Sequence, residues 1–291
     1  MDTATPFGHL LRDWRQRRRL TQLDLADAAG VSTRHVSFLE THRSLPSRAL
    51  LMRLGAVLDM PLRERNRMLV SAGFAPMYRE HRWDEQALQV AREAIERLLA
   101  AHEPYPALAI DRHWNLVTAN AAAQRLMAGL PEALLAPVPN VLRASLHPDG
   151  LSSRIANLPQ WRAHILERLQ HQHEATQDPV LDDLRKELAA YPGGEAEDPG
   201  AAEAIIVPLQ LRGPDGQVLS FLGTTTVFGT PNDVTLAELA IESFFPADPG
   251  TAVPAACDGA GLSARGAGQL MRRPPGSAPS PSRGTARHRP G

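Results

Sequence analysis

Residues 21–47 read TQLDLADAAGVSTRHVSFLETHRSLPS, and this stretch predicts two short helices joined by a tight turn. Thr21 is placed to cap the first helix, and Asp24 completes a capping box three residues later. Gly30 follows at the point where a left-handed residue would end that helix. Ser32 can then cap the second helix. The stretch therefore predicts a helix, a turn and a second helix in close succession.

The flanking residues extend this pattern to a five-helix domain over residues 5–73. Before the quoted stretch, apolar residues recur at the spacing of one helical face, at Phe7, Leu10, Leu11 and Trp14. After it, Pro46 and Ser47 open a fourth helix, and Pro61 separates that helix from a fifth, which ends at Gly73. The domain is therefore expected to be entirely helical.

The quoted stretch resembles the helix-turn-helix of lambda-repressor and Cro-type regulators, the xenobiotic-response-element class. The matching positions are Thr21, Gln22, Leu25, Ala26, Gly30, Val31, Ser32, Val36, Leu39, Glu40, Arg43 and Pro46. The resemblance implies an all-α, lambda-repressor-like domain that places its recognition helix in the major groove of double-stranded operator DNA. It also implies that Arg15 and Glu40 form an ion pair that ties the first helix to the third.

The candidate DNA-binding residues lie on and around the third helix. Because Val36 and Leu39 face inward, Thr33, Arg34 and Ser37 are left on the outward face. Arg34 is the best candidate base reader, since a guanidinium can donate two hydrogen bonds to guanine. The full set of expected DNA-binding residues is Gln22, Ser32, Thr33, Arg34, Ser37 and Arg43. The resemblance assigns Gln22 to a phosphate contact, and the alternative for every member is an ordinary solvated surface. For the basic run 17–19, phosphate contact and a solvated face remain equally open.

Charge is distributed unevenly along the chain of 291 residues, although the formal net charge is only −1. Residues 1–82 carry a net charge of +6, residues 83–250 carry −12, and residues 251–291 carry +5. The basic N-terminal region, followed by an acidic region, indicates that the N-terminal region is the part that binds a polyanion.

After a linker at residues 74–84, residues 85–248 predict an α+β domain with a small antiparallel sheet. A helix is expected at 85–101, with Ala87, Val90, Ala94 and Leu98 on one side. Two short strands are expected within 107–120, and helices within 121–190 carry Leu158, Trp161, Ile165 and Leu169 along one face. Residues 205–212 and 217–228 flank a hairpin signal, GPDG, at 213–216. Residues 249–291 are poor in aliphatic side chains and are expected to be a disordered tail.

The second domain resembles the ligand-binding domain of MmyB-type regulators, in which this kind of helix-turn-helix precedes a PAS-like domain. The resemblance rests on REHRWD at 79–84, HEPYPALAIDRHWNLVTANAAA at 102–123 and FLGTTTVFGTPNDVTLAELAIESFFPAD at 221–248. It implies a pocket for a small apolar effector, fatty-acid-like in one member. The candidate wall residues are Leu126, Trp161, Phe221, Thr224, Thr226 and Phe228, with plain core as the alternative for each. Asn120 is expected to cap a helix.

Several other classes of protein lack support in this sequence. No nucleophile, nucleotide-binding or paired-cysteine motif is present, so no enzyme activity is expected. His171 and His173 diverge by about 200° on a helix, so no metal site and no metal cofactor are expected. No run of apolar residues is long enough for a signal peptide or a membrane span. The only cysteine, Cys257, cannot form an internal disulfide, which favours a cytoplasmic protein.

Together these features predict a homodimeric, sequence-specific transcription regulator controlled by a small apolar ligand in its second domain. The alternative keeps the DNA-binding domain but gives the second domain only a role in dimerisation or in binding a protein partner.

Overall fold

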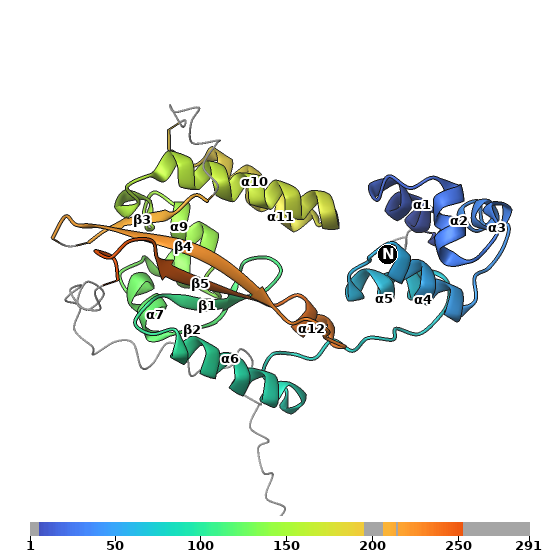
Figure 1. Ribbon diagram of the computed structural model, residues 1–291, viewed down its shortest axis with the longest axis horizontal. Helices are drawn as coiled ribbons and strands as arrows, with labels where there is room; N and C mark the ends of the chain where they lie inside the picture. The colour runs from blue at the N-terminus through green and yellow to red at the C-terminus, as the bar shows by residue number, and fades with distance from the viewer. Residues whose placement is uncertain (1–5, 195–205, 214, 253–291) are drawn as a thin grey trace, which may run out of the picture. The chain divides into compact units, whose positions relative to one another are not determined.

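The computed structural model describes residues 6–194, 206–213 and 215–252, and Figure 1 shows their helices and strands. The first domain contains helices α1 to α5, as the sequence predicted. Their bounds are α1 Phe7–Arg17, α2 Gln22–Ala29, α3 Thr33–Glu40, α4 Arg48–Val57 and α5 Leu62–Ser71.

Local sequence signals determine where α2, α3 and α4 begin and where α2 ends. The Thr21 hydroxyl accepts a hydrogen bond from Asp24 N while the Asp24 carboxylate accepts one from Thr21 N, which is the predicted capping box. Gly30 ends α2 with a positive φ of 65°. Ser32 and Ser47 cap α3 and α4 through their side chains.

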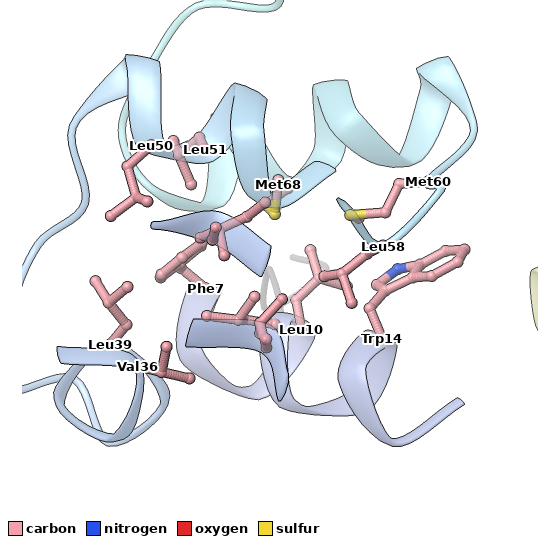
Figure 2. Packing of buried hydrophobic residues seen from close by; sticks show 14 of the residues in the cluster. Phe7, Leu10, Trp14, Val36, Leu39, Leu50, Leu51, Leu58, Met60 and Met68 are labelled. Atoms are coloured by element: carbon pink, nitrogen blue, oxygen red, sulfur yellow. The ribbon is translucent and has the colours of Figure 1, made fainter. Parts of the chain in front are cut away.

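The core of the first domain joins all five helices into one apolar cluster, part of which appears in Figure 2. Phe7, Leu10 and Trp14 of α1 belong to this cluster together with Val36 and Leu39 of α3, and Trp14 lies beside Leu58 and Met60. Gly8 permits the close approach of α1 to α3, because a Cβ there would lie 2.6 Å from the carbonyl oxygens of Leu39 and Glu40.

A buried ion pair also joins α1 to α3, as the resemblance implied. Arg15 donates from Nε to Glu40 Oε1 at 2.6 Å and from its second terminal nitrogen to Oε2 at 3.0 Å. Gln22 Nε2 donates to the same carboxylate at 2.8 Å. Burial opposes ionisation of Glu40, but these bonds outweigh it and hold its pKa below the usual value. The pair therefore fixes α3 relative to α1 and α2.

Between the domains, the predicted linker contains no helix or strand among residues 74–84. Its backbone is nevertheless anchored: Met77 N and Tyr78 N both donate to Asn66 Oδ1 on α5. Nδ1 of His81 lies 2.7 Å from Asp233 Oδ2.

The second domain is built on a five-stranded antiparallel sheet with the strand order β2-β1-β5-β4-β3. The strands are β1 Ala107–Ile110, β2 Leu116–Ala119, β3 Leu209–Arg212, β4 Val218–Val227 and β5 Ala240–Pro246. The remaining helices are η1 Gln86–Leu88, α6 Gln89–Ala101, α7 Ala121–Met127, α8 Glu132–Leu135, α9 Val141–Leu146, η2 Ser152–Arg154, α10 Leu158–Thr176, α11 Pro179–Ala190 and α12 Val234–Ala237. The predicted PAS-like, α+β class with a small antiparallel sheet is confirmed.

Helices cover the two faces of this sheet differently. In Figure 1, α10 and α11 lie on one side of the sheet and α6 lies on the other. Trp161, Ile165 and Leu169 of α10 pack on the first face together with Leu211 and Phe221. Ile95 and Leu99 of α6 pack on the opposite face, with residues of β1 and β5.

Two predictions for the second domain need correction. The expected apolar side of the 85–101 helix is wrong, because Val90 and Leu98 are 77% and 56% exposed, whereas Ile95 and Leu99 are buried. The expected start of the tail at residue 249 is also wrong. Thr251 is buried and accepts a hydrogen bond from Ser220 N, so the packed chain reaches residue 252. The rest of the predicted tail, 253–291, lies outside the described residues.

The contact at Gly8 predicts that Gly8→Ala destabilises the first domain. The added methyl group would overlap the backbone of α3, and such overpacking costs about 1–3 kcal/mol. Urea denaturation of the Gly8→Ala variant should show this loss, and Gln16→Ala, an exposed change on the same helix, should stay within about 0.5 kcal/mol of the wild type. An unchanged Gly8→Ala variant would contradict the close contact between α1 and α3.

The ion pair predicts that Glu40→Gln lowers the free energy of unfolding by about 3 kcal/mol at pH 7, because Arg15 would keep its charge without a carboxylate. Because folding lowers the pKa of Glu40, the ion pair stabilises the wild type fully at pH values above the ordinary glutamate pKa of about 4.3. The difference between the two proteins should therefore shrink as the pH falls below that value. Denaturation curves at several pH values measure this, and a difference independent of pH would argue against the pair.

Candidate functional sites

The first candidate site is the outward face of α3, the second helix of the helix-turn-helix. Arg34 is exposed on this face, and Thr33 and Ser37 are half-buried beside it, while Val36 and Leu39 are buried in the core. The Arg34 guanidinium lies over the Phe38 ring, 5.1 Å from the ring centroid. Phe38, which the sequence interpretation did not single out, therefore supports the side chain of the expected base reader.

The other expected DNA-binding residues surround this helix and have different local roles. Ser32 accepts a hydrogen bond from His35 N at 3.1 Å and so caps α3. Gln22 donates its amide to the buried carboxylate of Glu40 rather than standing free. Arg43 is exposed just beyond α3. The structure thus brings all six residues to α3 or its immediate neighbours.

The basic run at 17–19 is partly structural. Arg18 donates to the carbonyl oxygens of Leu58 and Asp59 at 2.7 and 2.6 Å, where α4 ends. The Arg17 guanidinium lies over the Trp14 ring at 4.8 Å. Arg18 therefore stabilises the end of a helix, a role that the sequence run alone does not indicate.

The second candidate site is a cavity of about 510 Å³ inside the second domain. The sheet contributes Leu108, Leu209, Leu211, Phe221, Gly223, Glu242 and Phe244 to its wall; α10 contributes Trp161, His164, Ile165, Glu167 and Arg168. Helices α7 and α9 contribute Leu126, Met127, Leu142 and Ala144, and the loops contribute Trp114 and Val207 among others. A cavity of this size with mostly apolar walls is typical of sites for small molecules.

Polar groups at the cavity come from α9, α10 and β5. Arg168 donates to the two carboxylate oxygens of buried Glu242 at 2.6 and 3.2 Å, and its guanidinium lies over the Trp114 ring at 4.4 Å. Burial, together with the neighbouring Arg168 cation, lowers the pKa of His164. Ser145 Oγ accepts a hydrogen bond from Trp161 Nε1 at 3.1 Å. None of these polar residues was among the predicted wall residues.

Three of the six predicted wall residues line the cavity, namely Leu126, Trp161 and Phe221. The prediction is wrong for the other three. Thr224 and Thr226 are exposed, and Phe228 packs with the α6 cluster on the opposite face of the sheet. The reason is the two-residue alternation of a strand: Phe221 and Gly223 point to the cavity, so residues of even number on β4 point away.

Other potential sites have structural explanations. Asn120 caps α7 by accepting a hydrogen bond from Ala123 N, as predicted. His113 Nε2 lies 2.9 Å from Asp178 Oδ2, and His173 Nδ1 lies 3.1 Å from the Asp178 carbonyl oxygen. Within residues 6–194, 206–213 and 215–252, no group of three or more His, Cys, Asp or Glu residues is arranged to hold a metal ion. No helix among the described residues is long and apolar enough to cross a membrane.

Comparison with known proteins identifies both domains. A family model described as the MmyB-like transcription regulator ligand binding domain matches residues 91–255, and a helix-turn-helix domain model matches residues 6–68. Among solved structures, the crystal structure of the clp gene regulator ClgR from Corynebacterium glutamicum matches 34% of this chain and 90% of that chain, at 28% identity. Its TM-score of 0.21 is too low for any argument about this fold. No curated protein matches the chain.

The ligand-binding-domain model covers more than half of the chain, and the helix-turn-helix model covers the domain that carries Arg34. The protein therefore belongs to the MmyB-like transcription regulators and is a DNA-binding transcription regulator.

Proposed function

We propose that this regulator is controlled by a small apolar molecule that occupies the cavity of its second domain. The observation that carries the proposal is the cavity of about 510 Å³, which lies within the domain matched by the ligand-binding model. A ligand can change DNA binding only by as much as its affinity differs between the competent and incompetent states of the protein. The cavity supplies a place where such a difference can arise.

In this proposal Arg34 reads a base, with Thr33 and Ser37 beside it on α3. Ser32 and Arg43 contact the backbone of the DNA from the surroundings of the helix, and Gln22 does so through the amide hydrogen that Glu40 does not take. The protein acts as a homodimer in the cytoplasm, and its two recognition helices enter successive major grooves about 34 Å apart. The net charge of +6 on residues 1–82 supports DNA binding by this domain.

The alternative, a second domain that only dimerises or binds a protein partner, has less support. A purely structural domain has no need of a large apolar cavity, since protein interiors are ordinarily packed without voids of this size. We assign no enzyme activity and no bound cofactor to the chain, because both matched domains are those of a transcription regulator.

The placement of Arg34 predicts that Arg34→Ala weakens binding to DNA selected by the wild-type protein from a random duplex pool. Loss of a bidentate guanine contact costs about 1–3 kcal/mol, and the preference for one base should relax at one position. Fluorescence anisotropy at constant salt measures both effects. Arg97→Ala removes an equal charge from an exposed position of α6 and should leave DNA binding unchanged. Unaltered affinity and base preference in Arg34→Ala would place the reader elsewhere.

The cavity predicts that an apolar small molecule can be recovered from the purified full-length protein. Mass spectrometry of an organic extract should find it with wild-type protein and with Leu98→Trp, an exposed change on α6. Leu126→Trp fills the cavity and should abolish recovery. Adding the molecule back to stripped wild-type protein should change its affinity for the selected DNA.

Equal DNA binding by loaded and stripped wild-type protein would contradict ligand control. Recovery of equal amounts of the molecule from Leu126→Trp and wild type would contradict the placement of the ligand in this cavity.

A further inference from the structure

The cavity contains a cation whose charge is already neutralised. Arg168 of α10 makes two hydrogen bonds to Glu242 of β5, and the Glu242 side chain is only 7% exposed. Thr225 of β4 joins the two, because its hydroxyl accepts from Arg168 at 2.8 Å and donates to Glu242 Oε1 at 2.9 Å. Strand register places Thr225 directly opposite Glu242. Arg168, Glu242 and Thr225 thus form a closed cluster before any ligand arrives.

This cluster makes the cavity unfavourable for an anionic ligand. A carboxylate that approached Arg168 would also meet the carboxylate of Glu242, which already holds the two guanidinium donors that a carboxylate usually takes. Leaving a charge in an apolar cavity without its own partner costs a large free energy. Glu167, at the exposed edge of the cavity, adds a second negative charge.

The remaining polar groups of the cavity suit a neutral partner. His164 lines the wall, and its lowered pKa means that the imidazole is uncharged at neutral pH, with one nitrogen that donates and one that accepts. Ser145 accepts from Trp161 and keeps its own hydroxyl proton for donation. Both residues can bond an alcohol, a carbonyl or an amide without requiring charge.

Building on the proposed ligand control, we infer that this cavity selects an uncharged ligand: an apolar body with one hydrogen-bonding head group, such as an alcohol, ester, ketone or amide. The Arg168–Glu242 pair disfavours carboxylates, because it leaves no unpaired cation to bind them. This assignment departs from the fatty-acid-like effector that the sequence resemblance implies.

The test compares three straight-chain probes that differ only in the head group: 1-decanol, decanoate and decylammonium. Equilibrium dialysis against the full-length protein at pH 7 should show that 1-decanol binds at least about tenfold more tightly than either charged probe. Glu242→Gln leaves Arg168 with an unbalanced charge, so its affinity for decanoate should rise at least about tenfold while that for 1-decanol changes little.

Glu167→Gln is the matched control, since it removes an equal charge at the solvent-exposed edge of the same cavity and should change decanoate binding by less than about threefold. The double variant Arg168→Gln/Glu242→Gln should lose the gain in decanoate binding. Thermal denaturation checks that each variant is folded, and the wild-type comparison stands even where a variant is not.

Tighter binding of decanoate than of 1-decanol by the wild type would overturn this inference while leaving ligand control intact. An unchanged affinity of folded Glu242→Gln for decanoate would overturn the role of the pair. If no probe binds, and Leu126→Trp and wild type give identical extracts, the proposed ligand site itself fails.

Discussion

The alternation of side chains across the five-stranded sheet decides how the second domain can work. Along β4 and β5, successive residues point to opposite faces, so Phe221, Gly223, Glu242 and Phe244 reach the cavity under α10. Ile241 points the other way and joins the apolar cluster against α6. One face of the sheet is therefore closed core, and the other lines the cavity. A shift of one residue in register would exchange these roles for every side chain.

Two buried carboxylates organise the two domains by the same physical principle. Glu40 is held by Arg15 and Gln22, and Glu242 is held by Arg168 and Thr225. In both places the desolvation of an acid is offset by hydrogen bonds from an arginine and a neutral side chain. The first cluster holds the recognition helix in place against α1 and α2. In the second cluster, Glu242 neutralises the charge of Arg168 at the cavity wall. In our proposal, this neutralisation sets the class of ligand.

DNA binding by the first domain and the proposed ligand control by the second require different degrees of rigidity. The first domain has a continuous apolar core and a close backbone contact at Gly8, so α3 is presented on a fixed scaffold. The second domain contains a cavity of about 510 Å³, and filling it adds dispersion contacts that the empty state lacks. In our proposal, ligand control depends on that difference between the occupied and empty states of the second domain.

The sequence by itself determined the first domain and the outline of the second. The caps at Thr21, Ser32 and Ser47, the turn at Gly30 and the apolar periodicity of α1 are local signals, and the fold follows them closely. The GPDG hairpin and the strands within 107–120 were also predicted, for the same reason.

Only the tertiary structure decided which face of each element is buried and which distant charges meet. Arg168 and Glu242 are 74 residues apart, and β5, for which no strand was predicted, is the central strand of the sheet. The misplacement of Thr224, Thr226 and Phe228 has a local origin instead, because the alternation of a strand already places them on the face opposite to Phe221. The non-local contribution is the pairing with neighbouring strands, which determines which of the two faces lines the cavity.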